Sequence, residues 1–406
     1  MQVSELRAQF PILSRTVYGK KLVYLDNAAT AQRPLSVVDL QRESALEANA
    51  NLHRAVHSLA GEATEIFEDT RRAVQAFLHA SAPEEIVFTA GATAAINLVA
   101  FSFGEAFVKE ADEVLVTVAE HHSNLLPWQM LCARKKAVLK VLDICENGGL
   151  DIESLQKSLS QRTKIVAISH ISNVLGLVNP VREIVRICHE KRIPVLVDGA
   201  QGVVHAPVDV QEMDCDFYVF SGHKVYAATG TGVLYGKRKW LELMPPYMGG
   251  GEMIESVSLS GFKPAPLPAK FEAGTQNING IPTLKPALEL ALQMRDDKEI
   301  QAEQKAIFDY VYDRLMQDDR IVLYGTDRAN KVPLFSFAVK GAHHEDLALI
   351  LDKMGVALRS GQMCAEPLMD RLGVTGLLRA SFAPYNTLEE AKFFIESLDK
   401  AIGMLV

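Results

Sequence analysis

The chain has 406 residues, which is long enough to bury a large core and to form two domains. Its 42 Lys and Arg residues against 50 Asp and Glu residues give a net charge of −8 at pH 7, without any basic run, which argues against a nucleic-acid or anionic-membrane partner. No apolar run reaches the roughly 18 residues of a membrane span, and the start of the chain, MQVSELRAQF, lacks the apolar core of a secretory signal.

The first strong periodic signal is an apolar stripe at helical spacing in residues 58–78, which predicts an amphipathic helix. Seven short apolar runs follow between residues 86 and 236, several of them separated by helix-like segments. Their sequences are IVFT, EVLVTV, AVLKVLDI, KIVAIS, IPVLVD, DFYVF and GTGVLYG. Strands without polar alternation are typical of a parallel sheet that helices cover on both faces. The segment therefore predicts an α/β fold with a mostly parallel seven-stranded sheet.

The pattern changes after about residue 285. A long amphipathic helix is expected there, followed by the strand-like runs VPLFSFAV and GVALRSG and by a helical C-terminus. These elements predict a smaller α+β domain over residues 286–406, next to a large domain over residues 26–285. We expect residues 1–25 to form an N-terminal segment that packs with the small domain.

Polar residues follow five of the predicted strands, at the point where each strand ends. In an open α/β sheet, ligands bind beyond the carboxyl ends of the strands, so these residues are expected to face one crevice. They are Thr93, His121, Asn173, Asp198, Gln201, Ser221, His223 and Lys224. Taken singly, Asp198 can cap a turn and His121 can be a hydrogen-bonded structural histidine. Their convergence at one edge of the sheet favours a binding site.

The chemistry of this set points to a phosphorylated aromatic aldehyde. A helix that begins at Thr93 offers free N–H groups to a phosphate, and Asp198 can pair with a protonated ring nitrogen. Gln201 can donate a hydrogen bond to a phenolic oxygen, and His121 can lie flat against the ring. Lys224 can form a Schiff base with the aldehyde. These features together describe pyridoxal 5′-phosphate (PLP).

Several motifs carry a resemblance to a known family, from YLDNAATAQRP at residues 24–34 to the end of the chain. They are SGHK, DGAQ, EHHSN, HISNVLG, FEAGT, RSGQMCAEPLM and LLRASFAPYNT. With these motifs the sequence resembles the class V, fold type I PLP-dependent transferases, and within them the group II cysteine desulfurases with selenocysteine lyase activity. The resemblance implies a seven-stranded sheet between helices and a smaller C-terminal domain that carries a cysteine loop.

The resemblance also implies roles for the matching residues. Lys224 would be the Schiff-base lysine, His121 the residue stacked on the ring, and Cys364 the nucleophile that accepts sulfur. The residues implied to hold PLP are Ala92, Thr93, His121, Asp198, Gln201, Ser221, His223, Lys224 and, from the partner subunit of a homodimer, Thr275. The residues implied to bind the substrate or to line its entrance and the dimer-side wall are Arg379, Asn173, Arg359, His53 and Arg54.

The implied reaction converts L-cysteine to L-alanine and leaves a persulfide on Cys364. The sulfur would then pass to an acceptor protein of the iron–sulfur cluster assembly machinery. L-selenocysteine is an alternative substrate, and an aminotransferase or a kynureninase-like hydrolase is an alternative reaction on the same scaffold. A binding protein without catalysis is a further alternative, which the presence of Lys224, Asp198 and Arg379 argues against.

The chain departs from the family pattern at three places. Ala92 stands where threonine is common, and GTQN replaces the commoner GTPN. Gln362 and Met363 stand where two histidines often precede the cysteine. The loop therefore brings no histidine of its own to Cys364, and its acceptor preference stays open.

The five cysteines are scattered and include no CxxC pair, which is typical of free thiols in a reducing cytoplasm and not of disulfides or a zinc site. Cys364 by itself reads as an inert thiol, but it lies in a glycine-containing loop close to Arg359, whose positive charge favours a thiolate. The other four lie in apolar helix or strand patterns, and we expect them in the core. They are Cys132, Cys145, Cys188 and Cys215.

Overall fold

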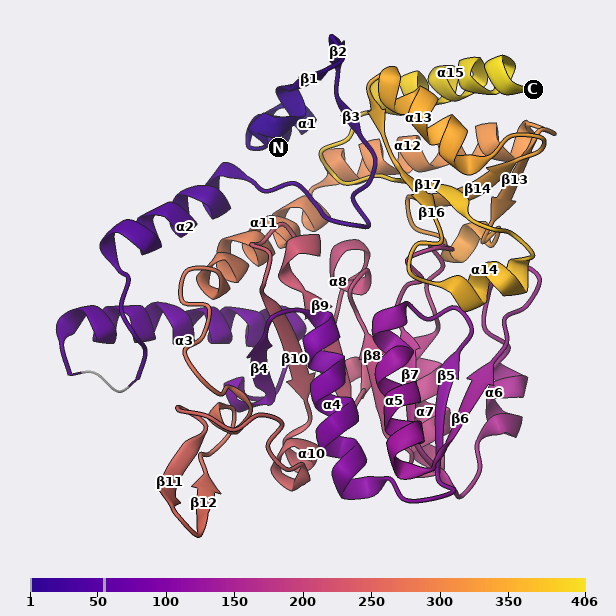
Figure 1. Cartoon of the computed structure of the whole chain (residues 1–406). Helices are drawn as coiled ribbons and strands as arrows, with labels where there is room; N and C mark the ends of the chain where they lie inside the picture. The colour runs from indigo at the N-terminus through magenta and orange to yellow at the C-terminus, as the bar shows by residue number, and fades with distance from the viewer. Residues whose placement is uncertain (1, 54–55) are drawn as a thin grey trace.

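The computed structural model describes residues 2–53 and 56–406 (Figure 1). Its centre is a seven-stranded sheet with the order β4-β10-β9-β8-β7-β5-β6. The strands are β4 (Ile86–Thr89), β5 (Glu113–Thr117), β6 (Val138–Leu142), β7 (Thr163–Ser169), β8 (Val195–Asp198), β9 (Phe217–Ser221) and β10 (Gly232–Gly236). Only β10 is antiparallel to its neighbours β4 and β9, while the other pairs are parallel. The mostly parallel seven-stranded sheet predicted from the sequence is confirmed.

Successive residues of each strand enter two different apolar clusters, because side chains along a strand alternate between the two faces of a sheet. In β9, Val219 packs with the cluster that includes α4 (Ala92–Phe107) and α5 (Leu126–Lys135). Its neighbour Phe220 packs with α3 (Ser58–Leu78), the helix expected over residues 58–78, and with α7 (Val181–Glu190). Figure 1 shows α4 and α5 in front of the sheet and α7 behind it. Both faces are therefore covered, as the apolar strands required.

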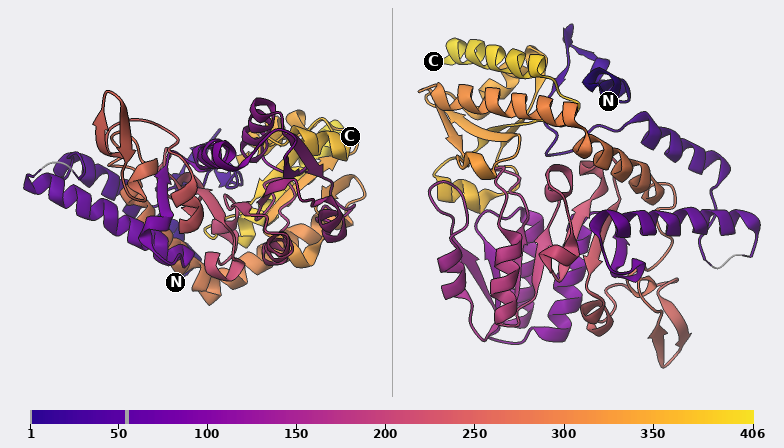
Figure 2. Two further views of the ribbon diagram at one scale, coloured as in Figure 1. Left: turned by 90° about the horizontal axis from the view of Figure 1, so that it is seen from below. Right: turned by 180° about the vertical axis from the view of Figure 1, so that it is seen from behind.

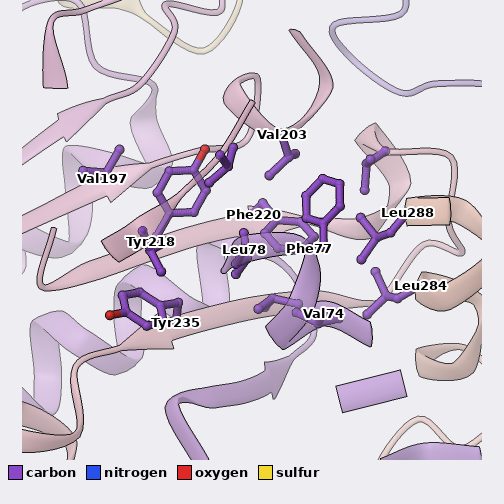
Figure 3. Packing of buried hydrophobic residues seen from close by; sticks show 14 of the residues in the cluster. Val74, Phe77, Leu78, Val197, Val203, Tyr218, Phe220, Tyr235, Leu284 and Leu288 are labelled. Atoms are coloured by element: carbon purple, nitrogen blue, oxygen red, sulfur yellow. The ribbon is translucent and has the colours of Figure 1, made fainter. Parts of the chain in front are cut away.

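The cluster behind the sheet also receives the helix α11 (Leu284–Asp296). Figure 3 shows Leu284 and Leu288 of this helix beside Phe77 of α3 and Phe220 of β9. A second helix, α12 (Lys298–Gln317), follows directly. The long amphipathic helix expected after residue 285 is present, but it is divided into α11 and α12. Asp297 separates the two, and its carboxylate caps α12 by accepting hydrogen bonds from the N–H groups of Glu299 and Ile300.

A second, smaller sheet is antiparallel and has the order β13-β14-β17-β16. Its strands are β13 (Ile321–Tyr324), β14 (Leu334–Val339), β16 (Arg359–Gly361) and β17 (Leu377–Ser381). Their apolar side chains pack with α12, α13 (His344–Lys353) and α15 (Leu388–Leu405) in a core separate from that of the large sheet. This is the α+β arrangement expected for the C-terminal region.

The N-terminal residues contact both sheets' cores. Strand β3 (Val23–Tyr24) pairs in parallel with β15 (Val356–Ala357) of the small unit. Phe10 packs against Tyr385, with ring centroids 4.6 Å apart, in the cluster behind the large sheet. The chain that leads into residue 26 is thereby fixed at the junction of the two units.

A hairpin of β11 (Ile254–Ser258) and β12 (Gly261–Pro264) stands away from the rest of the chain (Figures 1 and 2). No helix among residues 2–53 and 56–406 combines the length and the apolar character needed to cross a membrane.

Candidate functional site

A cavity of about 520 Å³ lies at the carboxyl ends of the large sheet's strands and is closed on one side by the small unit. Most of the residues singled out from the sequence line it, although they come from distant parts of the chain. They are Ala92, Thr93, His121, Asn173, Asp198, Gln201, Ser221, His223, Lys224, Arg359, Cys364 and Arg379. The expected convergence of strand-end residues is therefore present in the structure.

One end of the cavity holds the N-terminus of α4. Gly91, the residue before this helix, has φ 153°, and a Cβ there would approach Ser221 Oγ to 3.3 Å. Ala92 donates its N–H to Ser221 Oγ at 2.8 Å, and Thr93 Oγ1 lies 2.7 Å from Ser123 Oγ. The next N–H groups of the first turn have no partner within the helix. This end can bind a phosphate with backbone N–H groups and hydroxyls.

His223 contributes to the same end. Burial, together with the nearby positive charge of Lys224, lowers the pKa of its imidazole to about 4. The ring is therefore neutral at pH 7, and its Nδ1 lies 3.1 Å from Thr30 Oγ1. A neutral imidazole can still donate one hydrogen bond to an anion.

The middle of the cavity combines a neutral ring and a carboxylate. His121 Nδ1 accepts a hydrogen bond from the N–H of Ser123 at 3.0 Å, and burial lowers the pKa of His121 to about 3. Asp198 ends β8, and its carboxylate accepts a hydrogen bond from the N–H of Ala200 at 2.9 Å. Burial raises the pKa of Asp198, whereas the positive charge of Lys224 lowers it. An opposite charge stabilises a buried carboxylate, and a cationic ring nitrogen would supply one here.

Lys224 ends a short 3₁₀ helix, Gly222–Lys224, that directly follows β9. Burial lowers the pKa of its amine, and the negative charge of Asp198 opposes this shift. A lysine with a depressed pKa is more readily present as the free amine, which is the form that attacks an aldehyde. Gln201 lies nearby and uses one N–H to donate to Ala28 O at 2.8 Å.

Glu120 holds the turn that carries His121, and the sequence analysis did not single it out. Its carboxylate accepts hydrogen bonds from Thr117 Oγ1 at 2.7 Å, from Asn124 Nδ2 at 2.7 Å and from the N–H of Ser169 at 3.1 Å. Burial raises the pKa of Glu120 to about 7. Glu120 lies three residues after β5 and directly before the candidate residue His121, and this position in the sequence could have indicated its role.

Two arginines of the small unit, Arg359 and Arg379, line the cavity on the side opposite the large sheet. Arg379 in β17 is 3% exposed, donates from Nη1 to Asn173 O at 2.9 Å, and approaches Asp26 Oδ1 with Nη2 at 3.3 Å. Arg359, its partner in the β16–β17 register, reaches Asp26 Oδ2 at 3.2 Å. Asp26 thus forms ion pairs with both arginines and compensates their positive charge. The sequence analysis did not single out this residue. Arg379 Nε is buried without a hydrogen-bond partner among the described residues, which fits a place for a substrate carboxylate.

Cys364 is exposed and lies in a tight loop over residues 361–365, which we call the Cys364 loop. Met363 and Cys364 both have positive φ, 53° and 55°. Asn173 Nδ2 donates to Met363 O at 2.9 Å, so a residue expected to help bind substrate also holds this loop. The Met363 side chain packs in an apolar cluster that includes Val174 and Leu368.

The other cysteines correct one expectation. Cys132, Cys188 and Cys215 are buried as expected, but Cys145 is exposed. Strand β6 ends at Leu142, so Cys145 falls in the turn that follows the strand and not in its apolar pattern. All five cysteines are free thiols.

Two candidate residues within the described part of the chain do not line the cavity. Thr275 and His53 lie together at a second cavity of about 310 Å³, beside Arg71 and Glu272. Arg54 lies outside the described residues. Within one chain, Thr275 therefore does not join the phosphate end of the first cavity.

The donors and acceptors of the first cavity fit PLP group by group. The α4 N-terminus, Ser221 and His223 fit the phosphate, and the buried carboxylate of Asp198 fits a protonated pyridine nitrogen. Lys224 supplies the amine for the aldehyde. The buried Nε of Arg379, which has no hydrogen-bond partner in the described part of the chain, can bind an amino-acid carboxylate.

Comparisons with known proteins agree with this chemistry. The family described as "Aminotransferase class-V" matches residues 23–394. A probable cysteine desulfurase of Halalkalibacterium halodurans is 44% identical over 400 residues, covering 98% of each chain. A probable cysteine desulfurase of Vibrio cholerae is 42% identical over 405 residues, covering 100% of each chain.

Among solved structures, the cysteine desulfurase CsdA from Escherichia coli superposes with a TM-score of 0.91 at 38% identity, covering 100% of both chains. A cysteine desulfurase from Thermococcus onnurineus gives a TM-score of 0.92 at 34% identity, covering 99% of this chain and 98% of that one. With the family matched over residues 23–394 and identities of 42% and 44% over nearly the full length, the chain belongs to the class-V aminotransferase family, on its cysteine desulfurase branch.

Proposed function

We propose that this protein is a PLP-dependent cysteine desulfurase that converts L-cysteine to L-alanine and carries the released sulfur as a persulfide on Cys364. The observation that supports it most is the single cavity in which Lys224, Asp198, Arg379 and Cys364 meet from four separate chain segments. Aminotransferases need a lysine and a ring partner but no thiol, so the exposed Cys364 favours desulfuration over transamination.

Different parts of the cavity would bind different groups of the cofactor. Ala92, Thr93, Ser221 and His223 would hold the phosphate, and Asp198 would keep the proton on the ring nitrogen. When bound, PLP supplies an electron sink for the bond that breaks at the substrate. His121 and Gln201 would fix the ring, as the sequence predicts.

The chain's own residues would then act in a defined order. Arg379 binds the substrate carboxylate through its planar guanidinium, with Arg359 and Asp26 fixing the charge around it. Lys224, as the free amine, takes the proton from the substrate Cα. The Cys364 thiolate attacks the substrate sulfur, so the S–S bond forms as the C–S bond breaks, and the carbon skeleton leaves as alanine after protonation.

We further propose a homodimer in which Thr275 and His53 face the cavity of the partner subunit. The support is that Thr275 and His53 line a cavity of their own instead of the one beside Lys224. The persulfide would pass to an acceptor protein of iron–sulfur cluster assembly, and L-selenocysteine would be an alternative substrate. Five free thiols are consistent with a reducing compartment such as the cytoplasm.

The test is to incubate the purified holoenzyme with L-cysteine and a reductant and to measure alanine and sulfide together. We expect equal yields, and pyruvate or an amino group transferred to a keto acid would contradict the proposal. Cys364→Ala should keep the visible cofactor band but lose persulfide formation by a factor of at least ~100, since the attacking thiol is gone.

Two controls make this test specific. Cys145→Ala removes the other exposed thiol and should retain full activity. Borohydride reduction of the native enzyme should attach the cofactor to the peptide that contains Lys224, and it should fail to do so in Lys224→Ala. A persulfide formed normally by Cys364→Ala would refute the role of Cys364.

A further inference from the structure

The Cys364 loop has no histidine at positions 362 and 363, yet His122 of the large unit contacts the backbone at Cys364 and at Glu366, the residue directly after the loop. His122 donates its backbone N–H to Cys364 O at 2.7 Å. Its ring Nε2 accepts a hydrogen bond from the N–H of Glu366 at 3.1 Å. His122 thus holds the backbone at the cysteine and at the first residue of the following helix, Glu366–Leu372, while its neighbour His121 lines the cavity.

The backbone of this loop needs such support. Met363 and Cys364 are consecutive non-glycine residues in the left-handed region of backbone conformation, at φ 53° and 55°. This region is unfavourable for residues that carry a Cβ. A conformation of this kind persists only when surrounding contacts determine it. Two of the contacts that do so come from the large unit: Asn173 Nδ2 to Met363 O, and His122 to the residues that follow.

The hydrogen bond to the ring of His122 indicates which tautomer the neutral imidazole adopts. Because Nε2 accepts the N–H of Glu366, its lone pair must be free, so the proton of the neutral ring lies on Nδ1. The Glu366 carboxylate lies 3.7 Å from the same nitrogen. Met363 cannot take over this task, because its side chain points into the apolar cluster and is 8% exposed.

We propose that His122 is a positioning residue that holds the Cys364 loop against the large unit, so that the thiol meets the substrate sulfur at attack distance. The inference rests on the proposed desulfurase function. In this proposal His122, which follows β5, supplies the hydrogen bonds that position the Cys364 loop. His122 would act on the second half of the reaction, persulfide formation, and not on cofactor binding or substrate capture.

The test compares His122→Ala with His122→Gln in the holoenzyme. The amide oxygen of glutamine can reach the place of Nε2 and accept the N–H of Glu366, whereas alanine cannot. We expect His122→Ala to keep the cofactor spectrum and the spectral change on adding L-cysteine, with its half-saturation within about twofold. Its persulfide formation in a single turnover should fall about 10-fold to 100-fold, as misplacement of a reacting group by ~1 Å does. His122→Gln should regain most of that loss.

Two outcomes would overturn the inference: a single-turnover rate for His122→Ala equal to that of the native enzyme, or a His122→Gln variant as slow as His122→Ala. The same substitutions at the exposed His79, which pairs with Asp209 at the surface, serve as the matched control and should change nothing.

A second readout does not depend on the desulfurase reaction. Alkylation of Cys364 by iodoacetamide should change its rate constant by about threefold or more in His122→Ala, because the loop is released, and His122→Gln should restore it. Cys145 in the same sample is the internal reference and should react unchanged. If the native enzyme forms no persulfide, the proposed function fails while alkylation still tests the contact. Equal alkylation rates for Cys364 in all three proteins would contradict the contact itself.

Discussion

Glu120 illustrates how a single buried residue supports the site from outside the cavity. Its carboxylate joins the end of β5 to the first residues after it and to Ser169 at the end of β7. The chain of bonds continues through Asn124 to Trp128 Nε1, which donates to Asn124 Oδ1 at 3.1 Å. The turn that carries His121 is therefore tied to the sheet by side-chain contacts and not by its own backbone alone.

The raised pKa of Glu120 predicts a pH-dependent stability. Burial raises it from an ordinary 4.5 to about 7, and the nearby charge of Asp198 adds to the shift. Between these values the native state binds more protons than the unfolded state, so the contribution is full below pH 4.5 and lost as pH rises through 7. At about 1.4 kcal/mol per pH unit, the loss is up to ~3 kcal/mol.

We expect Glu120→Gln to remove this component, because an amide does not titrate. Urea unfolding at about pH 5.5 and pH 8 should give a smaller change in unfolding free energy for the variant than for the native protein. Titratable groups that are common to both proteins and do not interact with Glu120 cancel in this comparison. The same pH dependence in both proteins would show that Glu120 does not titrate in this range.

At the scale of elements, a buried ion pair ties α3 to the segment before α11. Arg71 is 2% exposed and Glu272 is 5% exposed, and two parallel hydrogen bonds of 2.7 and 2.9 Å join them. Arg71 also donates to Ile86 O at 2.8 Å, and Glu272 accepts the N–H of Phe88 at 2.6 Å. Helix α3, strand β4 and the chain that carries Thr275 are thus joined at one point.

Glu272→Gln should destabilise the protein by about 1–3 kcal/mol, because the buried Arg71 loses its buried carboxylate partner and keeps the partly exposed Glu68. The matched control is Glu212→Gln, which breaks an ion pair between exposed side chains, Arg182 and Glu212. That change should stay within about 0.5 kcal/mol. Urea unfolding of both variants measures the difference, and similar losses would mean that burial does not decide the cost.

At the scale of the whole molecule, the hairpin β11–β12 presents apolar side chains to solvent. Val257, Leu259 and Phe262 are all exposed, although a two-stranded hairpin has little stability of its own in water. Figure 2 shows the hairpin extending from the body of the chain. Such an exposed apolar surface fits contact with a second copy of the chain, as the proposed homodimer requires.

Replacing Leu259 and Phe262 by aspartate should raise the dimer dissociation constant by about tenfold or more, because burial of each side chain is worth ~1.5 kcal/mol or more. Sedimentation equilibrium measures this constant. Met404→Asp, at an exposed position of α15 far from the hairpin in Figure 1, is the control and should leave it unchanged. A native chain that sediments as a monomer would contradict the homodimer.

The sequence by itself determined the large sheet and most of the candidate site. Apolar runs of four to seven residues favour burial, so they define the strands of the sheet, and parallel strands bring their carboxyl ends to one edge. The polar residues that follow these strands therefore meet wherever the sheet forms. This is why Asp198 and Lys224 could be placed together from the sequence alone.

Only the tertiary structure showed which polar side chains contact each other across segments that are far apart in the sequence. Asp26 lies more than 300 positions before the arginines it contacts, and His122 reaches a loop in another unit. Hydrophobic periodicity records which face of an element is buried, but not which polar group lies across from it. The place of Thr275 away from Lys224 follows from the same limit, because it depends on how separate segments pack. The exposure of Cys145 has a local reason, since β6 ends at Leu142.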